Sequence, residues 1–210
     1  ALEDIKAADG ESEDYYKKDD LIATITTDET GVAKLTDLPL GKYYVKEKET
    51  ANGYVLDGTA REIDLTYRDQ DTAEVTYSSD WQNNRQKAEV KVLKKEKDSD
   101  RVLEGAVFAL CNKEDIVNAN GDVILKADTV IEEQATDKEG KLTFTADLPI
   151  GYTYYVKETS PAPGFATTDQ VQEFTFEYDG ADKETLSYEF TFEDEPTVVE
   201  ITKTSLTDGK

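Results

Sequence analysis

The feature that most restricts the fold of this chain is a duplicated pentapeptide. The sequence Tyr-Tyr-Val-Lys-Glu occurs at residues 43–47 and again at residues 154–158. Each copy follows a Leu-Pro-x-Gly turn and precedes an x-Gly-aromatic turn, which is typical of a short strand. Because alternate side chains of a strand share a face, Glu47 and Glu158 point the same way as the apolar residues of their strands. Each copy therefore predicts a strand that ends in a buried acid.

The duplication extends well beyond the pentapeptide. Gly31 and Gly140 are 109 positions apart, whereas Glu47 and Glu158 are 111 apart. This drift indicates single-residue insertions in loops between matching elements. A chain of 210 residues with such a repeat is expected to contain two modules.

Composition excludes several classes of function. The net charge of −23 argues against binding to nucleic acid or to an anionic membrane surface. No apolar run is long enough to insert into a membrane, and no signal peptide is visible. A chain that begins at Ala1 and contains neither His nor Met is expected to be a mature product or an excised piece.

The residue inventory also limits the chemistry. The single Cys111 cannot form an internal disulfide and is expected to be a small buried strand residue. Without His, catalysis by Ser-His-Asp or Cys-His arrangements is excluded on this chain. We expect no cofactor and no metal, because the acidic stretches at 98–100 and 118–122 lack the full spacing of a calcium loop.

Short alternating segments rich in Thr, Tyr, Val and Phe predict an all-β fold of tandem Ig-like sandwiches. In the second copy, strands are expected near residues 89–95, 106–111, 141–145, 153–158, 173–178 and 186–193. The Asp179-Gly180 pair predicts a hairpin turn between the last two strands. The polar segment 112–134 is expected to be a long insertion, with at most a short helix. In the first copy, a strand at 63–67 should lead through a polar turn to one at 75–81.

The two modules are not equally complete. Residues 88–97 form an alternating strand at the start of the second copy, and its equivalent in the first copy would lie about 17 residues before Ala1. We therefore predict a module at 1–87 that lacks its first strand or strands, and a complete module at 88–196. Residues 197–210 are expected to be a linker and the first strand of a following module.

Three polar residues share a face with apolar strand residues in the second module. Lys94 follows Val90 and Val92, Glu158 ends the duplicated strand, and Asp194 ends the last strand. In the first module the same alternation selects Asn83 for the inward face, at 111 positions before Asp194.

At this point the sequence resembles the Cna-B-type, or SpaA-type, prealbumin-like domains of Gram-positive surface proteins and pilins. The shared motifs are Val-x-Val-x-Lys at 90–94, Leu-x-Gly-Ala-x-Phe-x-Leu at 103–110, Thr-Asp-x-x-Gly at 136–140, Leu-Pro-x-Gly at 148–151 and Val-Lys-Glu-Thr-x-Pro-x-x-Gly-Phe at 156–165. The segments at 83–87 and 194–197 resemble the two ways in which the family leaves its last strand. The ensemble is specific, although each motif alone is weak.

The resemblance implies an intramolecular isopeptide bond between Lys94 and Asp194, with Glu158 as the catalytic proton shuttle and Glu47 as its equivalent in the first module. Burial disfavours charged forms, so a neutral amine could attack a neutral acid while water leaves. The alternative is a buried salt bridge between Lys94 and Asp194. Two acids beside one base would leave an unbalanced buried charge, which favours the covalent interpretation.

In the first module Glu47 and Asn83 are present, but the matching Lys is absent from this chain. Lys6, Lys17 and Lys18 lie in a polar stretch and are expected to be solvated. Either the chain is a fragment, or Lys203 of one copy completes the first module of the next and makes a head-to-tail polymer.

We therefore expect a structural stalk or pilin segment of an extracellular, cell-wall-attached surface protein, with adjacent modules or head-to-tail copies as partners. The alternative is an adhesin module that binds a host matrix protein or glycan. An enzyme with turnover is disfavoured, because the one reactive constellation consumes itself.

Overall fold

The computed structural model describes residues 1–7, 12–72 and 74–203, and no α-helix occurs among them. None of these residues therefore belongs to a helix that could cross a membrane. The chain divides into two compact units, Ala1–Asn84 and Arg85–Lys210, which we call unit 1 and unit 2 and describe separately. The division falls close to the predicted module boundary, and the predicted all-β fold is confirmed.

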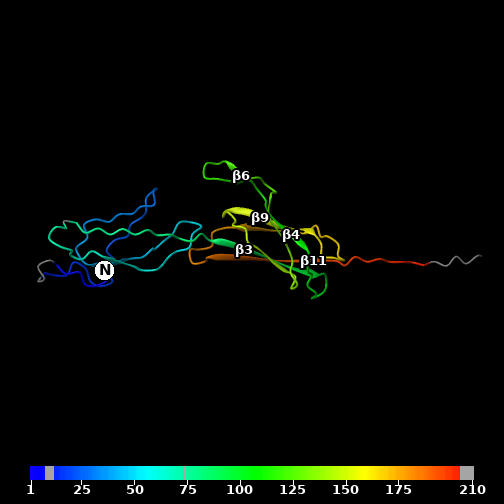
Figure 1. Cartoon of the computed structure of the whole chain (residues 1–210), viewed down its shortest axis with the longest axis horizontal. Coiled ribbons are helices and arrows are strands. Elements are labelled where there is room, and N and C mark those ends of the chain that lie inside the picture. Colours follow the sequence, from blue (N-terminus) through cyan, green and yellow to red (C-terminus); the bar gives the residue numbers. More distant parts are fainter. Residues whose placement is uncertain (8–11, 73, 204–210) are drawn as a thin grey trace, which may run out of the picture. The chain divides into compact units, whose positions relative to one another are not determined.

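Unit 2 is a sandwich of two sheets (Figure 1). The four-stranded sheet has the order β10-β9-β4-β7, and the three-stranded sheet has the order β11-β3-β8. The bounds of these strands are β3 (Lys87–Glu96), β4 (Val107–Asn112), β7 (Val130–Ala135), β8 (Lys141–Phe144), β9 (Tyr152–Ser160), β10 (Val171–Phe176) and β11 (Thr185–Asp194). All six strands predicted for this copy are present within a few residues of their expected bounds.

The first and last strands of unit 2 are direct neighbours. β3 and β11 pair in parallel over their whole length, from Thr185 opposite Lys87 to Asp194 opposite Glu96. Figure 1 shows the two strands side by side. Because they are parallel, the chain enters unit 2 at one end of this pair and leaves at the other. The two inward-facing ends of the strands carry Lys94 and Asp194.

The core of unit 2 lies between the two sheets and is largely aromatic. Phe108, Phe176 and Phe192 are fully buried. The ring of Phe174 in β10 lies 4.4 Å from the ring of Tyr188 in β11, measured between centroids. Aromatic contacts of this kind bury large apolar areas and hold the two sheets together.

The short helix that was considered possible within residues 112–134 is absent. This segment contains a small hairpin of β5 (Ile116–Val117) and β6 (Val123–Leu125), followed by β7, which pairs with β4 as an edge strand. The buried Asn112 side-chain amide ties the base of the hairpin by donating to the carbonyls of Glu114 at 2.7 Å and Lys126 at 2.6 Å. β7 was missed because an edge strand is partly exposed on both faces and alternates weakly.

The predicted hairpin at Asp179-Gly180 was also wrong in its pairing. β10 pairs with β9, whereas β11 pairs with β3, so the turn crosses from one sheet to the other. Gly180 does adopt a positive φ of 85°. The turn is held by buried Gln86, whose amide donates to the carbonyls of Gly180 at 3.1 Å and Lys183 at 2.7 Å. The aromatic residues of the two strands face each other across the core, but they do not share a sheet.

Unit 1 contains an antiparallel pair, β1 (Lys42–Val45) and β2 (Arg61–Asp64). Its buried apolar residues are Ala1, Ile5 and Tyr43. The strands expected at 63–67 and 75–81 were overestimated: β2 ends at Asp64, and no described residue from 74 to 83 is in a strand. The alternation of 75–81 is present in the sequence, but a strand also requires a neighbouring strand to hydrogen-bond with it.

Candidate functional site

The candidate site of unit 2 begins with Lys94, which is fully buried near the end of β3. Val90 and Val92 share its face and are also buried, so the strand carries the Lys side chain into the core. Its backbone is fixed on both sides: the Lys94 N–H donates to the Gly140 carbonyl at 2.8 Å, and the Lys94 carbonyl accepts from the Leu103 N–H at 3.0 Å.

Glu158 and Asp194 meet Lys94 from two different strands. The Lys94 Nζ lies 2.9 Å from Oε1 of Glu158, at the inward-facing end of β9. The same Nζ contacts Oδ1 of Asp194, the last residue of β11. All three side chains are fully buried. The structure therefore brings together the three residues that the sequence predicted, from positions that are 100 residues apart for Lys94 and Asp194.

Two aromatic rings enclose the cluster. The Lys94 Nζ lies 5.6 Å from the centroid of the Phe108 ring, and the Phe108 and Phe192 rings are 4.8 Å apart. An amine beside an aromatic face is stabilised when charged, but the surrounding apolar groups exclude the water that would otherwise solvate it. The three side chains therefore lie in a part of the core from which water is excluded.

The cluster carries more acid than base. Burial raises the pKa of Glu158 above its ordinary value of 4.5, and this effect exceeds the opposing attraction of Lys94. Among the described residues, Oδ2 of Asp194 accepts no hydrogen bond. A protonated Glu158 removes the excess negative charge and leaves one proton that can be passed between the two acids.

The loop after β9 holds the site from outside. Oε2 of Glu158 accepts a hydrogen bond from the Thr168 N–H at 3.1 Å, which fixes the carboxyl group toward Lys94. The same loop binds the chain as it leaves β11, because the Ala166 N–H donates to the Glu195 carbonyl at 3.1 Å and the Thr197 N–H to the Gly164 carbonyl at 3.0 Å. One loop therefore positions both the acid and the end of the strand that carries Asp194.

Unit 1 holds a related pair in Glu47 and Asn83. The Asn83 amide donates to Oε1 of Glu47 at 2.6 Å and to the Thr50 hydroxyl at 2.6 Å. Oε2 of Glu47 accepts from the Asp57 N–H at 2.9 Å, as Oε2 of Glu158 accepts from the Thr168 N–H. Both donors lie ten residues after their Glu. The two sites therefore share one architecture, although Glu47 and Asn83 are only half-buried.

The remaining lysines of the prediction lie at the surface. Lys6 and Lys17 are paired with Asp14 at 3.0 and 2.5 Å and are about two-thirds exposed, as expected of solvated side chains. Lys18 and Lys203 are also exposed. In the described part of unit 1, no Lys amine lies within ion-pair distance of Glu47. Cys111 is buried in β4, as expected.

Sequence reasoning missed two tyrosines that support the sites. The hydroxyl of Tyr43 donates to the Pro39 carbonyl at 2.5 Å, and that of Tyr154 donates to the Pro149 carbonyl at 2.6 Å. Each bond ties β1, which precedes Glu47, or β9, which contains Glu158, to the preceding Leu-Pro turn. The signal was available, because both the Pro and the first Tyr of the pentapeptide recur in the two copies.

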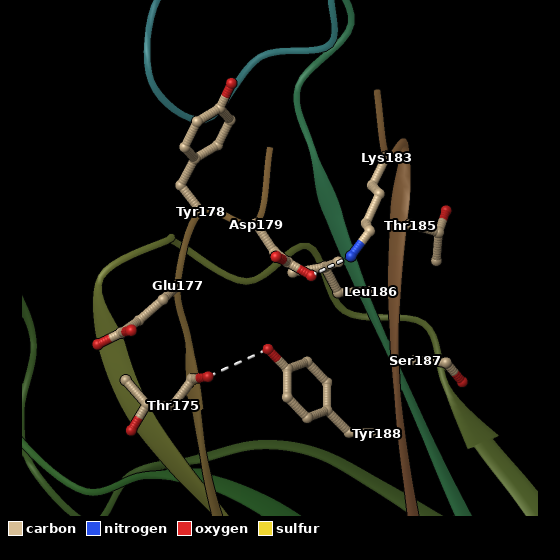
Figure 2. Close-up of a pocket in the computed structure, with 9 residues that line it drawn as sticks. All are labelled: Thr175, Glu177, Tyr178, Asp179, Lys183, Thr185, Leu186, Ser187 and Tyr188. Carbon is tan, nitrogen blue, oxygen red and sulfur yellow. Dashed lines mark hydrogen bonds and ion pairs between the residues drawn. The ribbon is translucent and has the colours of Figure 1, made fainter. Parts of the chain in front are cut away.

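A separate hollow of about 540 Å³ lies between the ends of β10 and β11 (Figure 2). Its Tyr188 hydroxyl donates to the Thr175 carbonyl at 3.1 Å, and Lys183 is paired with Asp179. The hollow lies toward the start of β11, whereas Asp194 is the last residue of that strand. It is therefore distinct from the buried cluster.

Comparison with known proteins identifies the nature of both units. The family described as SpaA, prealbumin-like fold domain, matches residues 5–81 and 88–189. No curated protein matches the chain. Among solved structures, the Bacillus anthracis TIE protein is similar over 82% of this chain and 28% of its own length, with 26% identity and a TM-score of 0.57. The chain thus spans little more than a quarter of that relative.

Two pilins are also among the similar structures. The pilus 2b backbone protein of group B streptococcus is 21% identical over 77% of this chain and 52% of its own length, with a TM-score of 0.38. The shaft pilin SpaA of Lactobacillus rhamnosus GG is 16% identical over 84% of this chain and 71% of its own length, with a TM-score of 0.40.

Proposed function

The chain belongs to the family of SpaA prealbumin-like fold domains, and from this membership we propose that it is a load-bearing segment of a Gram-positive surface protein or pilus. In this proposal unit 2 is closed by an amide bond between Lys94 and Asp194 that the protein forms by itself. The segment is extracellular, is attached to the cell wall through the protein to which it belongs, and has no enzymatic turnover.

One observation carries the proposal: a single amine lies fully buried between two buried carboxyl groups. A simple ion pair leaves the second acid without a role, whereas the condensation uses it as a proton relay. The raised pKa of Glu158 supports its protonated form, which can act on the neighbouring groups as a general acid.

The reaction is a condensation. The neutral Nζ of Lys94 attacks Cγ of the protonated Asp194 carboxyl, and a new N–C bond forms as the C–OH bond breaks. Protonated Glu158 gives its proton to the departing hydroxyl, which leaves as water, and takes up the proton that Nζ loses. Glu158 ends in its starting state. The fold supplies the proximity of the groups, an effect worth about 7–11 kcal/mol of the barrier.

The position of the bond gives its mechanical role. Tension that enters through β3 and leaves through β11 would otherwise shear the two strands apart along their parallel register. With Lys94 joined to Asp194, the load passes through the new covalent bond, and the 100 positions that separate the two residues are bypassed. Such a bond needs no oxidising environment, which suits a chain with one cysteine.

Intact mass spectrometry of the full chain tests the proposal. Condensation lowers the mass by about 18 Da, the mass of one water. Tandem mass spectrometry of a digest should then place the bond between the peptides that contain Lys94 and Asp194. An Asp194→Ala variant serves as the control with no acceptor and should keep its full mass. An unshifted mass for the natural chain would overturn the covalent mechanism.

A further inference from the structure

The loop that follows the catalytic Glu position is built in the same way in both units. It comprises residues 51–57 in unit 1 and residues 162–168 in unit 2, which are 111 positions apart. In each loop the carbonyl of the first residue accepts from the N–H of the fourth, at 3.2 Å in unit 1 and 3.1 Å in unit 2. The third residue is Gly53 or Gly164, with a φ of 86° or 90°. We call these two segments the clasp loops.

Each clasp loop holds the backbone directly after the candidate acceptor. The Val55 N–H donates to the Asn84 carbonyl at 2.8 Å in unit 1, and the Ala166 N–H donates to the Glu195 carbonyl at 3.1 Å in unit 2. Asn84 and Glu195 are the residues that directly follow the two candidate acceptors in the sequence. The fifth residue of the loop therefore fixes where the acceptor ends its strand or segment.

Two positions further along, the same loop holds the carboxyl group of the Glu. The Asp57 N–H donates to Glu47 at 2.9 Å, and the Thr168 N–H donates to Glu158 at 3.1 Å. A loop that only joined two parts of the backbone would explain the first contact and leave this second one unexplained. Because one short loop makes both contacts, and does so in both units, it sets the spacing between the acid and the backbone of the acceptor.

In unit 2 the segment that leaves β11 is held on two sides. The Thr197 N–H and the Thr197 hydroxyl both donate to the Gly164 carbonyl at 3.0 Å. On the other side, the Lys97 N–H donates to the Asp194 carbonyl at 2.9 Å. The clasp loop is itself anchored in the core by the buried ring of Phe165. The exit of β11 is therefore fixed between the end of β3 and a loop that is part of the core.

The position of the Asp194 carboxyl group depends closely on its backbone. An Asp side chain has two rotatable bonds, whereas the Lys94 side chain is long enough to adjust its reach. Asp194 is also the last residue of β11, and the ends of strands open more readily than their centres. A displacement of about 1 Å at a reacting group can slow a reaction about 100-fold. The contacts that hold the chain just after Asp194 therefore control how well its carboxyl carbon meets the amine.

We propose that residues 162–168 position Glu158 and Asp194 for the condensation, and that the amide bond forms after residues 195–197 have docked on this loop. This inference rests on the condensation proposed above and adds the groups that align it. They are positioning groups, because they act through hydrogen bonds and take no part in bond making. A last strand that is frayed or out of register leaves residues 195–197 undocked and its Asp194 unreacted.

The rate of the mass loss tests the proposal. The full chain is made by pulse-labelled cell-free synthesis and quenched in denaturant at increasing times, and intact mass spectrometry follows the loss of about 18 Da. Thr197→Val removes one donor to the Gly164 carbonyl, and Thr197→Pro removes both. We expect the loss to slow in that order, by up to about 100-fold in Thr197→Pro. Thr185→Val makes the same change at the exposed start of β11 and, as the matched control, should react at the natural rate.

A pH profile of the rate separates positioning from simple stabilisation. The hydrogen bond from the Thr168 N–H lowers the pKa of Glu158 and opposes the larger effect of burial. Thr168→Pro removes this N–H, so Glu158 should stay protonated to higher pH, and the fall in rate with rising pH should move to higher pH. Thr197→Pro acts on the backbone after Asp194 and should lower the rate without moving the profile.

The possible results decide between the proposals. A natural rate in Thr197→Pro would overturn the positioning role of the loop, as would an equal slowing in Thr185→Val. An unmoved pH profile in Thr168→Pro would also overturn it, because the loop would then not act through Glu158. A natural chain that never loses 18 Da would overturn the condensation itself. Failure of the clasp is therefore distinguishable from failure of the bond within unit 2.

Discussion

Replacing Glu158 with Gln separates the covalent bond from the packing around it. The Gln side chain has nearly the same size, so the pocket beside Lys94 stays filled. It cannot pass a proton between Lys94 and Asp194, so the condensation should fail and the protein should keep its full mass. Lys94 and Asp194 are then left as one positive and one negative group, and the variant can still fold around a balanced ion pair.

The size of the effect follows from the length of the closed loop. Lys94 and Asp194 are 100 residues apart, and a cross-link that closes about 100 residues stabilises the folded state by about 4.7 kcal/mol in the chain-entropy estimate. With an unfolding entropy of about 2.1 cal/mol/K per residue over roughly 110 residues, this corresponds to about 20 °C in the Tm of unit 2.

Differential scanning calorimetry and intact mass spectrometry measure both consequences on the same sample. Glu47→Gln in unit 1 is the matched control, because it changes the equivalent residue and should leave the 18 Da loss and the Tm of unit 2 in place. If Glu158→Gln shows the same loss of mass as the natural chain, Glu158 is not the proton relay. If the mass loss disappears while the Tm of unit 2 stays constant, the bond does not carry the stability assigned to it.

Three further changes have defined outcomes. Asp194→Asn should still cross-link, now by release of ammonia, so its final mass should equal that of the cross-linked natural chain. A mass about 1 Da below that of the unreacted natural chain is the mass of the unreacted variant and would contradict this prediction. Lys94→Met leaves the pKa of Glu158 raised by burial. An acid whose folded pKa is raised stabilises the fold below its ordinary value of 4.5 and loses that contribution as the pH rises through the folded pKa, so urea titrations should show lower stability at neutral pH than at acidic pH. A flat pH profile, equal to that of the double variant Lys94→Met with Glu158→Gln, would refute this prediction. Gly140→Ala, with φ at 69°, would place a Cβ 2.7 Å from the Lys94 carbonyl oxygen and should lower the Tm and slow the mass loss. The control Gly151→Ala, with φ at 87° and no atom within 4 Å of its Cβ, should cost only the backbone strain of about 1–2 kcal/mol. Equal effects of the two variants would show that the contact with Lys94 is unimportant.

The residues of the unit 2 site could be predicted because they obey strand alternation. Lys94, Glu158 and Asp194 each lie on the same face as buried apolar residues of their own strand, so local sequence was enough to place them inside. Their contact with one another could not follow from alternation alone. It depends on the parallel pairing of β3 with β11, which joins segments far apart in the sequence.

The errors arose where tertiary pairing outweighed local pattern. Asp179-Gly180 has the composition of a hairpin turn, but β10 and β11 find better partners in β9 and β3, and the turn crosses the sandwich instead. β7 is an edge strand with weak alternation, and its strand character comes from hydrogen bonds to β4. The Thr168 N–H that fixes Glu158 is a backbone group, so no side-chain pattern could reveal it.

The two candidate acceptors, Asp194 and Asn83, differ in burial and in chemical type. A carboxyl group accepts an amine only when it is neutral, so the Asp194 site needs a dry core that disfavours charge, and its three side chains are fully buried. An amide is neutral in water, so Asn83 can serve as an acceptor while half-buried beside Glu47. A deeply buried acceptor suits a bond that forms as one unit folds, because its strands enclose all the reacting groups together.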